Sequence, residues 1–429
     1  MSSALIISRV FPLDERMVHG IFQRLGTQVE ALARVADRIE CLFLVSAHRA
    51  AEFASVERLR AHEERLQRRW TSKLTLRAAA VVEGIPTARW ALYGPGVFDF
   101  YAQQLNIGVN NPAALDAVRG ALRARPDLIC AHRLSAMALL MRLSREVGAT
   151  PVFLDLDDIE HVALSRRLLR DPLWPMERLR LLQIPRLLLG EIQAIRRARL
   201  TFVCSERDCR YLRRLARSER VEAVPNSTHF PASIRAGHSE PIVLFVGYMD
   251  YAPNALAADT LVRDIWPLVH ARVPEARLII AGRNPQRLKS YAAAGPGVTF
   301  AGFVEDLAQL YARARVVCCP IRDGGGTRVK IIEAAAHARA VVSTRLGAEG
   351  LNFSDGREIL LRDGVAELAG ACVRLLQDPA AATRLGLAAR ESARHTYEHG
   401  AAVDHLERLF RRALPAAEPC RTAHQHAVR

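Results

Sequence analysis

The chain has 429 residues, about three times the length of a typical domain, which predicts two domains. Half of the residues are hydrophobic and 24% are charged, which excludes a disordered or low-complexity chain. The net charge of +15 comes almost entirely from arginine, because only three of the 60 basic residues are lysines. No apolar run approaches the ~20 residues that span a bilayer, and the apolar residues 4–7 follow no basic stretch. We therefore expect a soluble, cytoplasmic protein without a secretory signal.

Short apolar runs alternate with helical patterns along the whole chain. In the first half, strands are expected at residues 4–10, 39–46, 127–132, 151–158, 200–205 and 221–226. In the second half, they are expected at residues 242–247, 277–282, 298–304, 316–321, 340–344 and 358–363. Continuous apolar runs are typical of strands buried on both faces, and their alternation with helices predicts parallel βαβ units. The expected fold class is α/β, with two doubly wound Rossmann-like domains facing across a cleft, where ligands bind at the carboxyl ends of the strands.

A polar stretch rich in Pro, Gly and Ser separates the two halves. The expected division is an N-terminal domain over 1–226, a linker over 227–240, a C-terminal domain over 241–395, a helix over 396–414 that returns to the N-terminal domain, and a disordered tail over 415–429. The eight cysteines include no CxxC pair and mostly lie in apolar runs, which favours buried, reduced thiols over a zinc site or disulfides.

Residues 166–199 mix nine arginines with leucines and Trp174. One interpretation is a helical face that touches anionic lipid at the inner membrane. The other, which composition favours, is a solvated arginine-rich helix over a buried leucine stripe. Nucleic acid is disfavoured as a partner, because the basic residues are dispersed and no groove-reading motif is present.

A glycine-rich turn at 324–326 lies between a strand and a helix that is expected to start at about Arg328. Glycines let the backbone approach a ligand closely, Thr327 suits the N-cap position, and the first N–H groups of a helix bind anions. Arg328 and Lys330 oppose the helix dipole in the first turn, which a bound polyanion such as a diphosphate would explain.

Glu333 lies three residues after Lys330, on the same helix face and about one turn (~5 Å) further along. Its two carboxylate oxygens could accept hydrogen bonds from the two hydroxyls of a ribose. The same spacing also fits an ordinary glycine turn followed by a surface ion pair between Glu333 and Lys330.

These residues stand in a longer pattern. Residues 241–285 (PIVLFVGYMDYAPNALAADTLVRDIWPLVHARVPEARLIIAGRNP) and 298–351 resemble the donor domain of retaining GT-B glycosyltransferases, family 4-like, and within them the bacterial sugar transferases of exopolysaccharide systems. Residues 223–230 (AVPNSTHF) resemble the hinge between the domains of these enzymes. The first half resembles the acceptor domain only in its strand order and in short pieces such as FLDLDDIEH (153–161).

The resemblance implies transfer of a sugar from a nucleoside-diphosphate sugar to a lipid-linked or polysaccharide acceptor, with retention and without a metal or further cofactor. Carried over by motif, the donor-binding residues are Gly247, Arg283, Gly324, Gly325, Gly326, Thr327 and Glu333, with Glu333 at the ribose. Fixed N–H dipoles, Arg328 and Lys330 would stabilise the charge that develops on the leaving phosphate. The acceptor would attack the face that the leaving group vacates, and the departing phosphate would take its proton.

The sequence departs from the family in two places. The family often has two glutamates eight residues apart, but the position eight before Glu333 is Gly325. Either Asp323, the nearest acid, or backbone amides would then act in place of the first glutamate. The stretch after the first donor-domain strand, GYMDYAPN, also lacks the basic pair that many relatives carry there.

Candidates on the acceptor side are His132, Asp158, Gly20 and Arg24, which lie at or after expected strand ends. A buried core histidine with one satisfied nitrogen is an equal interpretation of His132. The carboxylates of 155–158 could suggest a metal site, but adjacent residues on a strand point to opposite faces, which disfavours it. Two other functions stay open, namely a nucleotide-sugar epimerase of the same architecture and a non-catalytic nucleotide-sugar binder.

Overall fold

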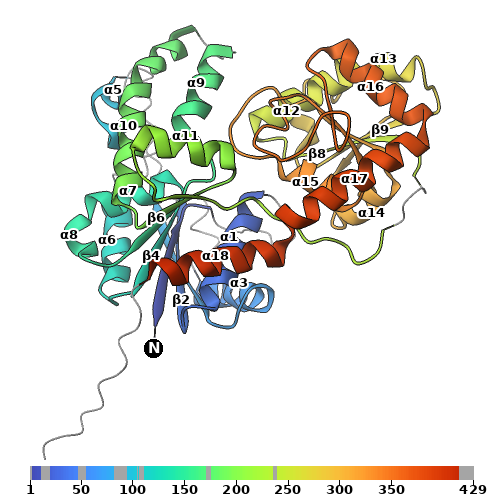
Figure 1. The fold of residues 1–429 in the computed structure, drawn as a ribbon. Coiled ribbons are helices and arrows are strands. Elements are labelled where there is room, and N and C mark those ends of the chain that lie inside the picture. Colours follow the sequence, from blue (N-terminus) through green and yellow to red (C-terminus); the bar gives the residue numbers. More distant parts are fainter. Residues whose placement is uncertain are drawn as a thin grey trace, which may run out of the picture.

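The computed structural model describes residues 2–10, 20–46, 55–81, 94–103, 105, 111–170, 175–234 and 239–414. It consists of two α/β domains that lie beside one another and are connected by a linker and by the last two helices (Figure 1). The tail predicted over 415–429 lies outside the described residues. No helix among the described residues is long and apolar enough to cross a membrane.

The N-terminal domain is built on a parallel seven-stranded sheet with the order β3-β2-β1-β4-β5-β6-β7. Its strands are β1 (Ser3–Ser8), β2 (Arg38–Ser46), β3 (Leu74–Val81), β4 (Leu128–His132), β5 (Val152–Asp155), β6 (Leu200–Val203) and β7 (Val221–Ala223). Side chains alternate between the two faces, so that Leu5 and Ile7 enter one core while Ala4 and Ile6 enter the other. Both faces are therefore covered by helices, as a parallel sheet requires.

One face of this sheet packs against α1 (Gly20–Ala33), α3 (Val56–Arg69) and α18 (His399–Ala413). The other packs against α6 (Pro112–Leu122), α7 (Leu134–Arg142), α10 (Ile184–Arg197) and α11 (Glu206–Ala216). The remaining elements are α5 (Pro95–Phe98), η2 (Phe100–Ala102), α8 (Ser144–Val147), α9 (Glu160–Arg170) and the 3₁₀ segment η4 (Pro175–Gln183).

The C-terminal domain repeats this topology with a parallel six-stranded sheet of order β10-β9-β8-β11-β12-β13. Its strands are β8 (Ile242–Val246), β9 (Arg277–Ala281), β10 (Val298–Gly302), β11 (Val316–Cys319), β12 (Ala340–Ser343) and β13 (Leu360–Leu361). Its helical elements are α12 (Ala252–Thr260), the π-helical η5 (Leu261–Ile265), α13 (Trp266–His270), η6 (Pro285–Arg287), α14 (Leu307–Arg313), α15 (Val329–Ala336), α16 (Val365–Gln377) and α17 (Pro379–Tyr397). The strand order reverses between β8 and β11, and ligands bind at such a switch point in doubly wound sheets.

All twelve expected strands are present, and the predicted fold class is confirmed. The sequence analysis missed β3, an edge strand that carries three alanines and exposes Thr75 and Arg77. Alanine has a low strand propensity, and an edge strand needs no continuous apolar run. The seven described cysteines are all buried free thiols, in agreement with the prediction.

The chain returns to the N-terminal domain after the second sheet is complete. Helix α17 ends at Tyr397, whose carbonyl accepts a hydrogen bond from the Thr228 amide of the linker. Helix α18 then runs beneath the first sheet alongside α1 (Figure 1), where Phe410 packs edge-on against Phe153 and Phe202. The linker and the α17–α18 junction therefore lie side by side where the chain crosses between the two domains.

A close backbone approach after β9 fixes where the donor-domain loops lie. We expect Gly282→Ala to destabilise the protein by about 3 kcal/mol, because the added Cβ would overlap Gly247 O and lie 2.7 Å from its carbonyl carbon, at a φ of +142°. Gly370→Ala in α16 is the control, since nothing lies within 4 Å of its Cβ, and should be neutral or stabilising. Urea unfolding of both variants measures the difference, and equal midpoints would contradict the role given to Gly282.

Candidate active site

The glycine-rich loop connects β11 to α15 and is held in shape by its own side chains. Gly324 and Gly326 adopt φ values of +91° and +65°, which favour glycine. Asp323 Oδ1 accepts a hydrogen bond of 2.6 Å from the Gly324 amide. The buried Arg328 guanidinium donates to the carbonyl oxygens of Gly325 and Gly326 and, at 3.1 Å, to that of Asp323. Arg328 and Asp323 therefore both serve to fold the loop.

The start of α15 differs from the prediction that Thr327 caps it. The helix begins at Val329, and Arg328 occupies the N-cap position without a side-chain cap. Thr327 Oγ1 instead accepts a 2.9 Å hydrogen bond from Asn226 Nδ2 of the hinge. The prediction was wrong because this partner is distant in sequence, and the helix start keeps no side-chain acceptor for its first amides, as an anion site requires.

Lys330 lies in the first turn of α15, over the end of β8. Its Nζ donates a 2.7 Å hydrogen bond to Asn254 Oδ1 and lies 4.3 Å from the centre of the Phe245 ring. A Cβ on Gly247 would come within 3.1 Å of this Nζ, so glycine leaves space beside the ammonium group. Burial lowers the pKa of Lys330 to about 8. Because this value is still above neutral pH, the side chain stays largely charged there. The structure thus brings Gly247 and Lys330 together, with Asn254 as a partner that the sequence analysis did not assign.

Both carboxylate oxygens of Glu333 bond to groups other than Lys330, so the surface ion pair considered from spacing alone is not formed. Glu333 Oε1 accepts a 3.2 Å hydrogen bond from Gln23 Nε2 of α1, and its Oε2 accepts one of 3.0 Å from the Tyr311 hydroxyl. Burial raises the pKa of Glu333 above its usual value, and burial likewise raises that of Tyr311. Glu333 is therefore a partly buried carboxylate at the contact between the two domains.

Arg283 follows β9 on the far side of Gly247. Its guanidinium carbon lies 4.6 Å from the centre of the Phe303 ring, and its carbonyl accepts a hydrogen bond from the Met249 amide. Arg283 thus lies at the carboxyl edge of the second sheet, beside the loop that follows β8.

Several residues of the N-terminal domain lie directly against the donor-side loop. A Cβ on Gly20 would come within 2.7 Å of Val329 Cγ2, so α1 approaches the start of α15 closely. Glu349 receives charged hydrogen bonds from Arg166, with Nη2 at 3.0 Å, and an ion pair from Arg207. Asp158 lies against Gly325, as described below. The carboxyl ends of the two sheets therefore meet at the glycine-rich loop.

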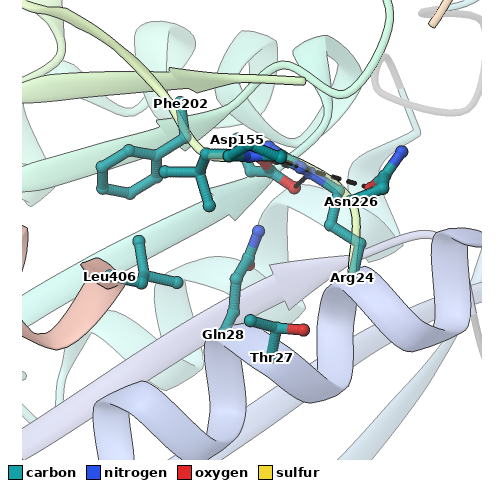
Figure 2. Close-up of a pocket in the computed structure, with 9 residues that line it drawn as sticks. Arg24, Thr27, Gln28, Asp155, Phe202, Asn226 and Leu406 are labelled. Atoms are coloured by element: carbon teal, nitrogen blue, oxygen red, sulfur yellow. Dashed lines mark hydrogen bonds and ion pairs between the residues drawn. The ribbon is translucent and has the colours of Figure 1, made fainter. Parts of the chain in front are cut away.

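Arg24 is buried inside the N-terminal domain and is not exposed at its surface. Its Nε lies 2.8 and 2.9 Å from the two carboxylate oxygens of Asp155, while Nη1 donates to Val224 O at 2.8 Å. Figure 2 shows these groups beside a cavity of about 10 Å³, into which Gln28 points from α1. The cavity is large enough for one water at most. Arg24 therefore fastens the hinge, through Val224 and Asn226, to the end of β5.

His132 is fully buried at the end of β4. Its Nδ1 shares a 2.9 Å hydrogen bond with Ser8 Oγ, and its Nε2 lies 3.8 Å from Asp155 Oδ2. Burial lowers the pKa of His132, so the neutral ring is favoured. These features fit a buried core histidine with one satisfied nitrogen, which the sequence analysis considered beside an acceptor-binding role.

The acidic stretch after β5 is divided between two arginines. Asp155 pairs with Arg24, and Asp157 Oδ1 accepts a 2.8 Å hydrogen bond from Arg133 Nε. Within the described ranges, no group of three or more His, Cys, Asp and Glu side chains could hold a metal ion. The donor-side arrangement, with a helix start, a buried ammonium and a carboxylate one turn further, is suited to an anion that carries hydroxyl groups.

Comparisons with known proteins bear on the fold and on the C-terminal domain. Residues 240–378 match the family model described as glycosyl transferases group 1. A trehalose synthase from Rubrobacter xylanophilus is 29% identical over 150 residues, which cover 31% of this chain and about a third (35%) of the relative. The sucrose-phosphate synthase of Thermosynechococcus elongatus has a similar fold, with a TM-score of 0.66, 20% identity and coverage of 96% of this chain and 99% of that one. HepE of Anabaena, in complex with UDP and glucose, has a TM-score of 0.62, 13% identity and coverage of 96% and 100%. The fold is that of GT-B glycosyltransferases, and the domain match supports a glycosyltransferase.

The buried ammonium group should make anion binding depend on pH. Lys330 loses its proton as pH rises through about 8, so we expect the affinity for a nucleoside diphosphate to fall by up to about tenfold per pH unit above that value. Calorimetry between pH 7.5 and 9.5 measures this, in a range above the last phosphate pKa of roughly 6. Lys330→Gln should bind weakly without this slope, whereas Lys289→Gln, at an exposed lysine, should keep it. A wild-type affinity that is constant over the range would contradict the assignment.

Proposed function

We propose that this protein is a retaining glycosyltransferase that moves a sugar from a nucleoside-diphosphate sugar to a lipid-linked or saccharide acceptor, without a metal. The observation that carries the proposal is the arrangement on α15. The uncapped helix start and the Lys330 ammonium lie at one end, and the Glu333 carboxylate lies about one turn further. A diphosphate at the helix start would place its attached pentose near Glu333.

Relatives support the same ligand class. HepE was crystallised with UDP and with UDP-glucose, and the pneumococcal O-GlcNAc transferase GtfA with UDP and GlcNAc. The trehalose synthase and sucrose-phosphate synthase are named for products in which sugars are joined. Exopolysaccharide assembly and a family 4 assignment are further parts of the proposal, supported by the resemblance in the donor domain.

The proposed mechanism follows from where charge develops. When the bond between the sugar and the β-phosphate breaks, negative charge gathers on the phosphate oxygens. The α15 amides and Lys330 would stabilise that charge, and Arg328 would keep the loop carbonyls turned away from it. The acceptor hydroxyl would attack on the face that the phosphate leaves, and a phosphate oxygen would take its proton. No protein nucleophile is needed on this route.

Two substitutions on α15 test the donor site. We expect Lys330→Ala to lower turnover by about 100-fold or more, because it removes one fixed donor to the leaving phosphate. Glu333→Ala should weaken donor binding severely, with Lys289→Ala as the control at an exposed lysine. Release of nucleoside diphosphate in the presence of acceptors is the readout, after a thermal-shift screen of nucleoside diphosphates and their sugars has identified the donor.

The outcomes separate the other two functions. Interconversion of the donor sugar without an acceptor would support an epimerase, and tight donor binding without turnover across acceptors would support a non-catalytic binder. A Lys330→Ala variant with activity within a few-fold of wild type would contradict the mechanism.

We also propose that the outer end of the N-terminal domain contacts the membrane that carries a lipid-linked acceptor. Helices α9 and α10 stand at that end of the domain (Figure 1). Exposed leucine and arginine side chains occur together on α9, on α10 and on the η4 segment between them. We call them the basic leucine surface: Arg167, Leu169, Arg178, Leu179, Leu182, Arg186 and Leu189. Exposed leucines among arginines suit an anionic lipid surface, although Leu168 and Leu187 of the same segment are buried as a core stripe.

Sedimentation with vesicles containing anionic lipid tests this surface. Leu179→Ser combined with Leu182→Ser should weaken binding by about tenfold or more, because burial of each leucine contributes roughly 1.5–3 kcal/mol. Leu256→Ser with Leu387→Ser is the control, at exposed leucines of α12 and α17. Binding that is equal in both variants, or insensitive to salt, would contradict the proposal.

A further inference from the structure

The hollow at Gly325 is filled by a side chain of the other domain. A Cβ built on Gly325 would lie 2.8 Å from Asp158 Cγ and 3.2 Å from Oδ2, and would overlap Oδ1. Gly325 is not among the residues with positive φ, unlike Gly324 and Gly326 on either side. The backbone therefore does not require glycine at position 325. The Asp158 carboxylate does.

One oxygen of this carboxylate lacks the hydrogen-bond partner that a buried acid usually has. Asp158 Oδ1 is buried and has no hydrogen-bond partner among the described residues. Its neighbour Asp157 is held by Arg133, which leaves Asp158 as the acid of this pair that faces the glycine-rich loop. Burial, followed by the charge of Asp157, raises the pKa of Asp158 to about 6. A buried oxygen without a partner in a polar site indicates a group that bonds to a ligand.

The sequence of the loop also points to position 325. Gly325 stands eight residues before Glu333, where the resemblance would place a first carboxylate. Asp323, the alternative considered from sequence, has its Oδ1 engaged by the Gly324 amide. The Arg328 charge offsets part of the rise in the pKa of Asp158 that burial causes, so the acid lies near the guanidinium that folds the loop.

We propose that Asp158 supplies, from the N-terminal domain, the carboxylate that the donor loop lacks at Gly325, and that it binds a hydroxyl group of the donor sugar. The inference rests on the proposed function and deepens it. The ribose would be bound by Glu333 of the C-terminal domain, while the sugar would be bound by a residue of the opposite domain. Sugar recognition is then complete only when the domains are in contact, whereas nucleoside diphosphate binding is not affected by Asp158.

The test compares nucleoside diphosphates with their sugars by calorimetry on the full chain. UDP, GDP, ADP and dTDP and their glucose conjugates are first screened on the wild type, and the base that binds is used throughout. Asp158→Ala should weaken binding of the conjugate by about 10- to 100-fold while leaving that of the diphosphate within about twofold, as loss of a charged hydrogen bond implies. Asp116→Ala, at an exposed acid of α6, is the control for both ligands.

Exchange of the two side chains separates a binding role from a packing role. Gly325→Asp alone should impair conjugate binding, because the new side chain meets Asp158. The double variant Asp158→Gly with Gly325→Asp puts a carboxylate back into the same space and should restore conjugate binding to within about fivefold of wild type. Gly295→Asp is the control, since nothing lies within 4 Å of its Cβ. Thermal unfolding of each variant verifies that it folds.

The outcomes are distinct. If no diphosphate in the screen binds the wild type, the proposed function fails and this inference fails with it. If the diphosphate and its conjugate bind but Asp158→Ala weakens both equally, or neither, the proposed function stands and the assignment of Asp158 is overturned. It is also overturned if only the KM of the acceptor rises, which would place Asp158 on the acceptor side.

Discussion

A buried ammonium group at the start of a helix is the constraint around which the donor-side residues are arranged. Burial lowers the pKa of Lys330 from 10.5 to about 8, so keeping it charged at neutral pH costs the folded protein on the order of 3 kcal/mol. Its partner Asn254 is neutral, and the nearest acid of α15, Glu333, is turned toward Tyr311. The Glu333 charge therefore offsets only part of that cost. An anion bound at the helix start would offset the cost of the buried charge. This indicates that the region is arranged for a ligand at the expense of the stability of the unliganded protein.

The position of this group depends on contacts between the domains. The hinge residue Asn226 accepts a hydrogen bond from Arg24 at its amide oxygen and donates one from its amide nitrogen to Thr327. One side chain thus connects the core of the first sheet, through Arg24 and Asp155, to the residue that precedes Arg328. A buried charged pair is costly to break, so the hinge is a fixed point about which the domains are aligned rather than a loose tether.

The sequence predicted the local features of the site and missed those that depend on distant partners. Lys330 and Glu333 lie on one helix as the period of α15 requires, and the glycines of the loop adopt the φ values that favour glycine. Thr327 was expected to cap α15 but bonds instead to Asn226, which is 101 residues away. The pairing of Arg24 with Asp155, 131 residues away, likewise leaves no trace in local spacing, and a contact of Arg24 with the acceptor stays a prediction. Side chains with long-range partners are decided by the packing of the two sheets, which no local pattern contains.

The departure at Gly325 shows how a missing residue can be informative. In the sequence, Gly325 weakened the resemblance, because an expected acid was absent from the loop. In the folded protein, the loop at this point approaches Asp158 so closely that a side chain at 325 would be excluded. Positions 158 and 325 thus compete for the same space between the two domains. A carboxylate can occupy that space from the N-terminal domain or from the loop. The proposed role of Asp158 has a consequence for dynamics. An acid on the loop would bind the sugar in any domain arrangement, whereas Asp158 would bind it only when the two domains are in contact, so that sugar binding would be coupled to that contact.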